Sequence, residues 1–291
     1  MNSSRSHNFL LIGLVSTGKT SFLAALWYAV QQTQAPTGLV LKKLDGDSKY
    51  LNKIRDAWLE FKPVGRNQHD IETYVSMHLK DTLEDDEVHL TFPDLSGEAF
   101  KLQWTKRQLT TSYDSCLRSA DGGILFIHPS SIVHPLRITE IDDAAALIDE
   151  GVTAEQAAPK TIKPTAVPWD IEKAPTQVQL IELLQFMMRH EKFKAPFRLA
   201  IAISAWDLIK SSNLSPRSWV VKQLPMLDQF LASNRSMFEI GFYGVSAQGG
   251  DYEGNNSTEL QNKLPARRIE IVGDGVKNAH DITEPLQWLM R

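Results

Sequence analysis

The segment from Gly13 to Thr20 constrains this chain more than any other, because it reads Gly-Leu-Val-Ser-Thr-Gly-Lys-Thr. It satisfies the pattern G-x-x-x-x-G-K-[ST] at every fixed position. In that pattern the glycines let backbone N–H groups fold around phosphate oxygens, the lysine reaches the β and γ phosphates, and the last hydroxyl ligates Mg²⁺. The segment therefore predicts a loop that binds the phosphates of a nucleoside triphosphate.

The residues on either side of this loop supply the context that the motif requires. Residues 8–12 form an unbroken apolar run, typical of a strand buried on both faces, and residues 19–32 show apolar residues at helical spacing. A turn that matched by chance would lack this order of strand, loop and helix. Lys19 is a candidate catalytic residue, since its charge can stabilise a transferred phosphoryl group. The candidate nucleotide-binding residues here are Gly13, Val15, Ser16, Thr17, Gly18, Lys19, Thr20 and Ser21.

Strand and helix patterns alternate along the rest of the chain, which predicts an α/β fold. Two alternating runs, 73–79 and 87–92, are joined by a short acidic turn and predict an antiparallel hairpin at the edge of the sheet. The other candidate strands are 38–44, 123–128, 197–203 and 237–245. The candidate helices are 48–61, 98–118, 176–190 and 215–232. We expect a P-loop NTPase fold, with a mostly parallel sheet, one antiparallel edge hairpin and helices on both faces.

We expect residues 1–291 to form a single domain with one insertion, at about residues 129–175. This stretch contains six prolines and one amphipathic helix candidate, at 139–150. Insertions of this length are usually either functional or disordered. It is therefore our candidate surface for a protein partner.

Charge and composition exclude several other classes of protein. The formal charge of -4 and the pI near 6.1 give no basic face for binding nucleic acid. Cys116 is the single cysteine, the first twenty residues lack the zones of a secretory signal, and no apolar run approaches the roughly 20 residues of a membrane span. We therefore expect a cytoplasmic protein without a membrane span. The histidines form no H-E-x-x-H pattern, which argues against a zinc site.

An acid that could serve the metal follows the expected strand 87–92. Phosphoryl transfer needs a carboxylate near the metal, at the end of a strand that neighbours the phosphate loop. Asp94 opens the sequence Asp-Leu-Ser-Gly-Glu, which has the form D-x-x-G-E. Thr20 and Asp94 are therefore the candidate Mg²⁺ ligands. The alternative is an ordinary strand-to-helix turn in which Asp94 caps a helix.

Residues 94–98 resemble the switch II motif of translation-factor-class GTPases. The resemblance implies that Asp94 holds Mg²⁺ through water and that the Gly97 amide senses the γ phosphate. Glu98 stands where many of these GTPases have a glutamine that orients the attacking water. It is a candidate catalytic residue, and the alternative is a first-turn helix acid.

Residues 62–67 lie where the same GTPases have switch I. A threonine would normally close on Mg²⁺ there, whereas this chain has Asn67 locally and Thr73 further along, so the metal-sensing residue stays open. Arg66 is a candidate catalytic residue, as an internal arginine finger that neutralises charge in the transition state. The alternative is a solvated loop arginine.

Residues 204–207, Ser-Ala-Trp-Asp, follow an expected strand and resemble the N-K-x-D motif of GTPases. A carboxylate at the position of Asp207 accepts hydrogen bonds from guanine N1–H and the exocyclic amine, a pattern that adenine cannot donate. Ser204 and Ala205 depart from the motif, because they replace its asparagine and lysine.

Ser246 and Ala247 follow the next expected strand and resemble the S-A loop whose backbone touches the guanine carbonyl. Together with Asp207 they favour GTP over ATP. The alternative is that Asp207 caps a helix and that Ser246 ends a strand. The identity of the nucleobase would then stay undetermined.

Four segments together resemble the bacterial double-GTPase group, which consists of translation-factor-class (TRAFAC) P-loop GTPases of predicted conflict and anti-phage systems. They are 12–27, 92–98, 204–207 and 282–289. The resemblance covers nearly the whole chain and implies a nucleotide-controlled switch that acts with partner proteins encoded nearby. Val15 stands where fast-hydrolysing small GTPases favour glycine, so we expect slow hydrolysis without a partner.

The resulting hypothesis is an Mg²⁺-dependent protein that binds and hydrolyses GTP and acts as a molecular switch in bacterial antiviral defence. Two alternatives remain. One is a nucleotide-gated binding module with negligible hydrolysis, and the other is a P-loop ATPase.

Overall fold

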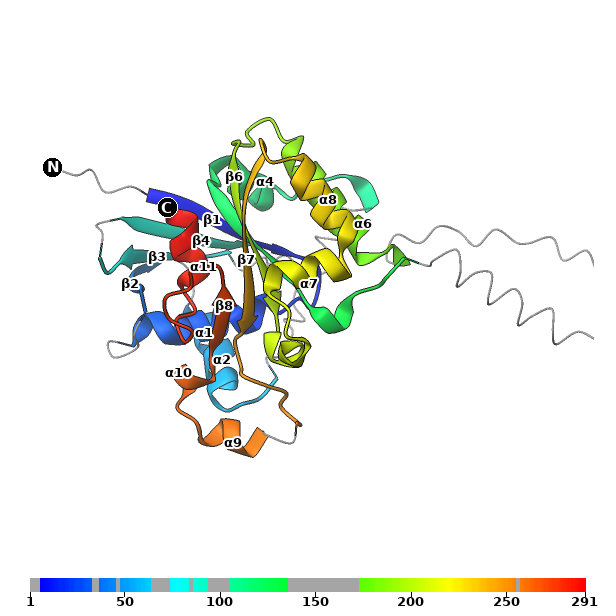
Figure 1. Ribbon diagram of the computed structural model, residues 1–291. Helices are drawn as coiled ribbons and strands as arrows, with labels where there is room; N and C mark the ends of the chain where they lie inside the picture. Colours follow the sequence, from blue (N-terminus) through cyan, green and yellow to red (C-terminus); the bar gives the residue numbers. More distant parts are fainter. Residues whose placement is uncertain are drawn as a thin grey trace, which may run out of the picture.

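The computed structural model places the strands of this chain in one sheet (Figure 1). It describes residues 6–32, 37–45, 48–63, 74–83, 86–93, 105–135, 173–254 and 257–291. Within these residues eight strands follow the order β2-β3-β4-β1-β5-β6-β7-β8. They are β1 (Ser6–Gly13), β2 (Leu39–Asp45), β3 (Tyr74–Asp81), β4 (Glu87–Pro93), β5 (Gly122–Ile127), β6 (Phe197–Ser204), β7 (Phe238–Ser246) and β8 (Glu270–Gly273).

Five neighbouring strands, β4, β1, β5, β6 and β7, run parallel. The expected hairpin is confirmed, because β3 pairs antiparallel with β4 and places Met77 opposite Leu90. Two details were not predicted. β2 lies outside the hairpin, antiparallel to β3, and β8 adds an antiparallel strand at the opposite edge. β8 has only four residues, which are too few to show an alternating pattern.

The central strand β1 shows why helices cover both faces of the sheet. Phe9 and Leu11 belong to one core, whereas Leu10 and Ile12 belong to the other, as the two-residue period of a strand requires. On the first face lie α1 (Lys19–Gln31), α2 (Ser48–Leu59) and α11 (Glu284–Met290). On the second lie α4 (Thr111–Ser119), α6 (Thr176–Met188), α7 (Pro216–Gln223) and α8 (Pro225–Ser233) (Figure 1). The expected fold class is therefore confirmed.

Short elements connect these layers. They are α9 (Ser257–Asn262), α10 (Pro265–Arg268) and the 3₁₀ turns η1 (Pro129–Ser131), η3 (Trp206–Leu208) and η4 (Lys210–Ser212). In the part of the chain that the structure describes, every helix is too short or too polar to cross a membrane.

Two of the expected helices have different limits. The helix expected at 215–232 is divided at Pro225, which lacks an N–H group and begins α8 as its first residue. The helix expected at 98–118 is interrupted in its described part, because residues 105–106 are helical and α4 begins only at Thr111. Arg107 has a φ of 55°, outside the helical range, and the Thr110 side chain accepts a 3.3 Å hydrogen bond from the backbone N–H of Tyr113. Pro225 marked the first of these limits in the sequence, whereas no local signal marked the second.

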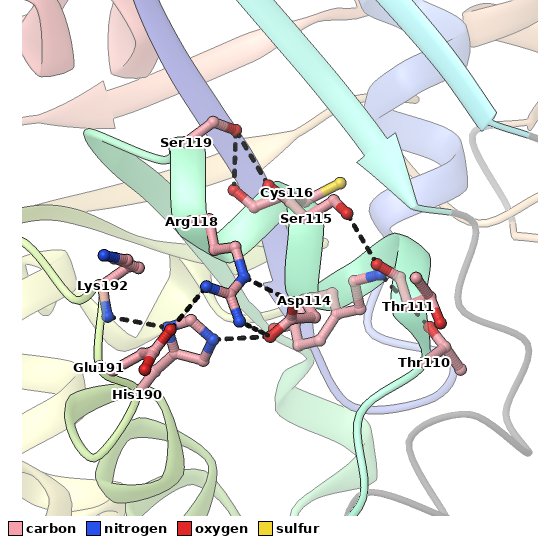
Figure 2. Close-up of polar contacts among 11 residues, drawn as sticks. Thr110, Thr111, Asp114, Ser115, Cys116, Arg118, Ser119, His190, Glu191 and Lys192 are labelled. Atoms are coloured by element: carbon pink, nitrogen blue, oxygen red, sulfur yellow. Dashed lines mark hydrogen bonds and ion pairs between the residues drawn. The ribbon is translucent and has the colours of Figure 1, made fainter.

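A polar cluster fastens α4 to the residues that follow α6. Figure 2 shows Arg118 and His190 directed at the carboxylate of Asp114. His190 Nε2 lies 2.8 Å from Asp114 Oδ1, and Arg118 Nε donates to Asp114 Oδ2 at 2.7 Å. Arg118 also donates to Glu191 at 2.6 Å. Asp114 and Arg118 thus tie α4 to the residues that follow α6.

Asp281 joins the C-terminal segment to the start of β2. Its side chain is 3% exposed, and Oδ2 accepts hydrogen bonds from the Gly38 N–H at 2.7 Å and from Gln287 Nε2 at 2.9 Å. Oδ1 accepts from the N–H and the hydroxyl of Thr283, at 2.8 and 2.6 Å. Four donors therefore compensate the burial of this charge.

Candidate functional site

The loop from residue 13 to residue 18 lies where the order of the sheet changes direction. β1 is flanked by β4 on one side and by β5 on the other, and all three run parallel. In open α/β sheets ligands bind at such a switch point, beyond the carboxyl ends of the strands. β1 ends at Gly13 and α1 begins at Lys19, so the loop occupies this position.

Gly13 and Gly18 are required by the backbone of the loop. Gly13 has a φ of 148°, and a Cβ there would lie 2.8 Å from the Phe126 carbonyl oxygen. Gly18 has a φ of 87°, and a Cβ there would lie 2.9 Å from Cβ of Ser204. Both values of φ disfavour any side chain. Backbone conformation and close packing therefore both require glycine at these two fixed positions of the motif.

The ammonium group of Lys19 lies over the loop. Its Nζ donates to the carbonyl oxygens of Gly13 at 2.8 Å and Leu14 at 2.6 Å, and it lies 3.2 Å from Thr17 Oγ1. The Thr17 hydroxyl is buried and donates to the Leu14 carbonyl at 2.9 Å. The Thr17 side chain therefore shapes the loop, whereas the Lys19 charge lies where phosphate oxygens would compete for it.

The first turn of α1 is suited to an anion. Gly18 caps the helix without a side-chain hydrogen bond, and no acidic residue occurs in the first turn. The N–H groups and the positive dipole end are therefore not matched by a carboxylate from this turn. Thr20 and Ser21 lie in the same turn, and both are partly buried. Val15 and Ser16 lie at the exposed tip of the loop.

Thr20 is the candidate Mg²⁺ donor that lies in the described part of the chain. Mg²⁺ usually keeps several waters and takes one or two carboxylates together with substrate phosphates, so a hydroxyl at Thr20 and one nearby acid suffice. β4 is parallel to β1 and ends at Pro93, which brings the chain to the loop's edge of the sheet just before residue 94. The described residues contain no cluster of three or more His, Cys, Asp or Glu side chains that could hold a metal ion by themselves. The described residues thus fit an Mg²⁺ ion that is bound together with the phosphates of a nucleotide.

Several predicted residues lie outside the described part of the chain. These are Asp94, Gly97, Glu98 and Arg66, together with Asn67, Thr73 and residues 136–172 of the insertion. Their proposed roles in metal binding, catalysis and partner binding therefore stay predictions.

Asp207 is held by the loop that follows β7. Ser246 is 1% exposed, and its hydroxyl donates to Asp207 Oδ1 while accepting a 3.2 Å hydrogen bond from the Gly249 N–H. Ala205 adopts a left-handed conformation with a φ of 45°, which turns the chain from β6 into η3. Ser246, the last residue of β7, thus orients Asp207, which follows β6; sequence analysis did not predict this contact.

The replacement of asparagine by Ser204 brings the two halves of the site into contact. Ser204 is 6% exposed, its hydroxyl donates to the Ile127 carbonyl at 3.2 Å, and its side chain packs against Gly18. The short side chain therefore fits directly beside the phosphate loop. Trp206 is buried against Gly244, where a Cβ would lie 2.3 Å from the indole ring.

A cavity of about 310 Å³ joins the two halves. Four predicted residues line it: Gly18, Ser21, Asp207 and Ala247. The cavity has the size of a small ligand pocket. Lining residues that sequence analysis did not identify include His128, Leu208, Gln248, Asp251 and Tyr252. Burial lowers the pKa of His128, and the negative charge of Asp207 opposes this shift.

The parallel sheet, the phosphate loop at its switch point and the cavity beside that loop define a P-loop nucleotide-binding protein. Residues 10–289 match the family described as Double-GTPase 1. The chain therefore belongs to the Double-GTPase 1 family, and the resemblance stated from its motifs is confirmed. Membership places the chain among GTPases, which bind and hydrolyse GTP.

Two solved structures of Sup35 also match the chain. The complex with GDP is 14% identical, with a TM-score of 0.35, and the complex with GMPPNP is 15% identical, with a TM-score of 0.36. Each match covers 86% of this chain and 39% of the Sup35 chain, so the present chain spans well under half of the structures it matches. No curated protein sequence matches the chain.

Proposed function

We propose that this chain is an Mg²⁺-dependent molecular switch that is controlled by GTP. One observation carries the proposal: the phosphate loop and the Ser246-oriented carboxylate of Asp207 border the same cavity, through Gly18 and Asp207. A triphosphate tail and a guanine base are the two ends of one ligand. Their chemical partners occur together in this cavity.

At the phosphate end, the backbone N–H groups of residues 13–18 and the first turn of α1 bind phosphate oxygens. Lys19 exchanges its bonds to the Gly13 and Leu14 carbonyls for bonds to the β and γ phosphates, which stabilises the charge of the transferred group. Ser21 lies in the same turn and binds near the α phosphate.

Mg²⁺ is held by the Thr20 hydroxyl and the Asp94 carboxylate together with the phosphates. When bound, it supplies Lewis-acid stabilisation of the β and γ oxygens. Gly97 reports the γ phosphate, Glu98 orients the attacking water, and Arg66 neutralises transition-state charge. These last three roles are supported by the resemblance of the motifs.

At the base end, Asp207 accepts hydrogen bonds from the N1–H and the exocyclic amine of guanine. Ser246 keeps this carboxylate in position, and the backbone of Ala247 contacts the guanine carbonyl. Adenine offers no matching pair of donors. The site therefore selects GTP.

Slow turnover without a partner is the second part of the proposal. Val15 is 49% exposed at the tip of the loop, and it stands where fast-hydrolysing small GTPases favour glycine, which supports slow hydrolysis. A protein partner encoded nearby, in a bacterial defence system and in the cytoplasm, would then control hydrolysis, with the 129–175 insertion as its binding surface. The same observation on Val15 favours a second candidate, a binding module with negligible hydrolysis.

The test is a titration of the full-length protein with GTP and ATP, each with and without Mg²⁺, followed by measurement of phosphate release. We expect GTP to bind more tightly than ATP, Mg²⁺ to strengthen GTP binding, and phosphate to be released slowly. Tight binding without release would favour the module, and preferential binding of ATP would overturn the guanine assignment.

Lys19→Ala is the variant that tests the site itself. It should lose most affinity for GTP, because no other described side chain brings an ammonium group to the loop carbonyls. Lys222→Ala is the matched control, since Lys222 is exposed on α7. Equal GTP affinity in the two variants would overturn the proposed site.

A further inference from the structure

Tyr252 is an aromatic residue of the cavity to which the motifs assign no role. It lies between the glycines 249–250 and α9, and it lines the cavity together with Asp207 and Ala247. Its side chain is partly exposed. Its ring is therefore within reach of a ligand that occupies this space.

Two contacts hold the Tyr252 ring from behind. Its centroid lies 5.3 Å from that of Phe61, and the two planes make an angle of 63°, an edge-to-face geometry that is favourable for aromatic rings. The Tyr252 hydroxyl also lies near Ser21, in the first turn of α1, and Ser21 counteracts the rise that burial gives the pKa of Tyr252. The ring is thus fixed between the phosphate-binding helix and the end of α2.

Phe61 is itself supported by a buried cation. The guanidinium of Arg268 lies 5.7 Å from the Phe61 ring centroid and 4.8 Å from that of Trp58. Arg268 is 3% exposed and donates to the carbonyl oxygens of Trp58 and Leu59 at 3.4 and 3.3 Å. This packing makes the wall behind Tyr252 part of the core, so the ring has a defined position.

The other aromatic residues of the cavity are less suited to cover a base. Phe22 and Phe126 are 1% and 0% exposed, because they belong to the core beneath the loop. The His128 ring is occupied at Nδ1, which accepts a 3.2 Å hydrogen bond from the Ser130 N–H. Ala205, which also lines the cavity two residues before Asp207, is not aromatic and offers a single methyl group. Among the described phenyl rings that line the cavity, Tyr252 is therefore the one that is partly exposed.

We propose that Tyr252 is a nucleoside-binding residue that covers the nucleobase by ring contact while Asp207 binds its edge. This inference rests on the proposed binding of a guanine nucleotide. A purine has two apolar faces, and contact of a base with an aromatic side chain strengthens binding with little dependence on base identity. Tyr252 therefore adds affinity for the nucleoside, and Asp207 adds the choice of base.

The test compares Tyr252→Ala and Tyr252→Phe with the unmodified full-length protein by calorimetry. The ligands are GDP, which contains the base, and inorganic triphosphate, which contains only the phosphate end. We expect Tyr252→Ala to bind GDP about 10-fold to 100-fold more weakly while its affinity for inorganic triphosphate is unchanged. Tyr252→Phe keeps the ring and should bind GDP within about threefold of the unmodified protein.

Three results would overturn the inference. The first is unchanged GDP affinity in Tyr252→Ala. The second is tighter GDP binding by this variant, which would mean that the ring occupies the space of the base. The third is equal weakening toward both ligands, which would mean that the ring only supports the loop through Ser21. If the unmodified protein bound neither GDP nor GTP, the proposed function itself would fail. If the unmodified protein bound these nucleotides and any of the three results were found, only the role of Tyr252 would be refuted.

Discussion

Gly18 of the phosphate loop packs directly against Ser204 at the end of β6, where a Cβ on residue 18 would lie 2.9 Å from the Cβ of Ser204. The two parts of the site therefore touch without an intervening residue. A displacement of one loop must be transmitted to the other, because both are attached to the ends of buried strands.

Gly18→Ala should therefore damage the site in two ways. A left-handed φ of 87° strains an alanine, at a cost of about 1–3 kcal/mol, and the new methyl group pushes the loop away from Ser204. We expect GTP affinity to fall at least about 100-fold, since displacements near 1 Å have effects of this size. Calorimetry and thermal unfolding measure the two effects.

Gly275→Ala is the matched control for backbone strain. Gly275 has a φ of 75°, yet a Cβ there would meet no atom within 4 Å. This variant should lose stability by a similar amount and keep its GTP affinity. Equal losses of affinity in the two variants would show that the Gly18–Ser204 contact is irrelevant to binding.

Asp207→Asn should exchange one base preference for another. The amide oxygen can still accept from N1–H, but the NH₂ group cannot accept from the exocyclic amine of guanine and instead donates to the 2-carbonyl of xanthine. We expect GTP affinity to fall about 100-fold and XTP affinity to rise, as measured by competition with a labelled nucleotide. Asp251→Asn, a change in an exposed residue of the same cavity, should leave the order of GTP and XTP unaltered. A variant at position 207 that still preferred GTP would exclude the carboxylate from base recognition.

Asp114→Asn should reduce stability in a pH-dependent way. Hydrogen bonds from Arg118 and His190 hold the pKa of Asp114 below its ordinary value of 3.8 (Figure 2). A carboxyl group with a depressed pKa in the folded state stabilises the fold above its unfolded pKa, and this contribution is lost as the pH falls through the folded pKa. The difference in unfolding free energy between the native chain and the variant should be greatest above about pH 4 and disappear below the folded pKa.

Urea unfolding at a series of pH values measures this difference. A difference that stayed constant down to the most acidic pH would show that the charge of Asp114 does not stabilise the α4–α6 contact. Because Asp114 and Arg118 are largely accessible to solvent and salt, the difference should also shrink at high ionic strength.

Asp281→Ala should destabilise the whole fold. Four donors from Gly38, Thr283 and Gln287 would lose their acceptor, and the two donors of Thr283 are buried. We expect a loss of about 2–4 kcal/mol in the free energy of unfolding. Asp274→Ala provides the control, since Asp274 is exposed and should change stability by less than about 0.5 kcal/mol. A loss at position 281 no larger than at position 274 would contradict the role given to this network.

The phosphate loop and its two flanking elements could be predicted because local sequence determines them. The apolar run before Gly13, the two glycines and the helical spacing after Lys19 each act over a few residues, and the structure has the strand, loop and helix at these positions. Asp207 and Ser246 could be predicted from their order after two buried strands. Their mutual hydrogen bond follows because parallel neighbouring strands end side by side.

Other features depend on contacts between distant parts of the chain and left no local signal. Tyr252 acquires its position from Phe61 and Ser21, which lie far away in the sequence. The break near Arg107 and the short strand β8 are likewise decided by tertiary packing. Pro225 was visible in the sequence, and its place at the start of α8 shows that it should have been taken as a helix boundary.

The bond between Asp281 and Gly38 also affects how the protein is made. Translation proceeds from the N-terminus, so β2 emerges from the ribosome long before the carboxylate that binds Gly38, the residue just before this strand. The apolar side chains of Leu286 and Leu289, which fill the core under β5 and β6, arrive equally late. This face of the sheet therefore stays uncovered by Leu286 and Leu289 until α11 has been synthesised.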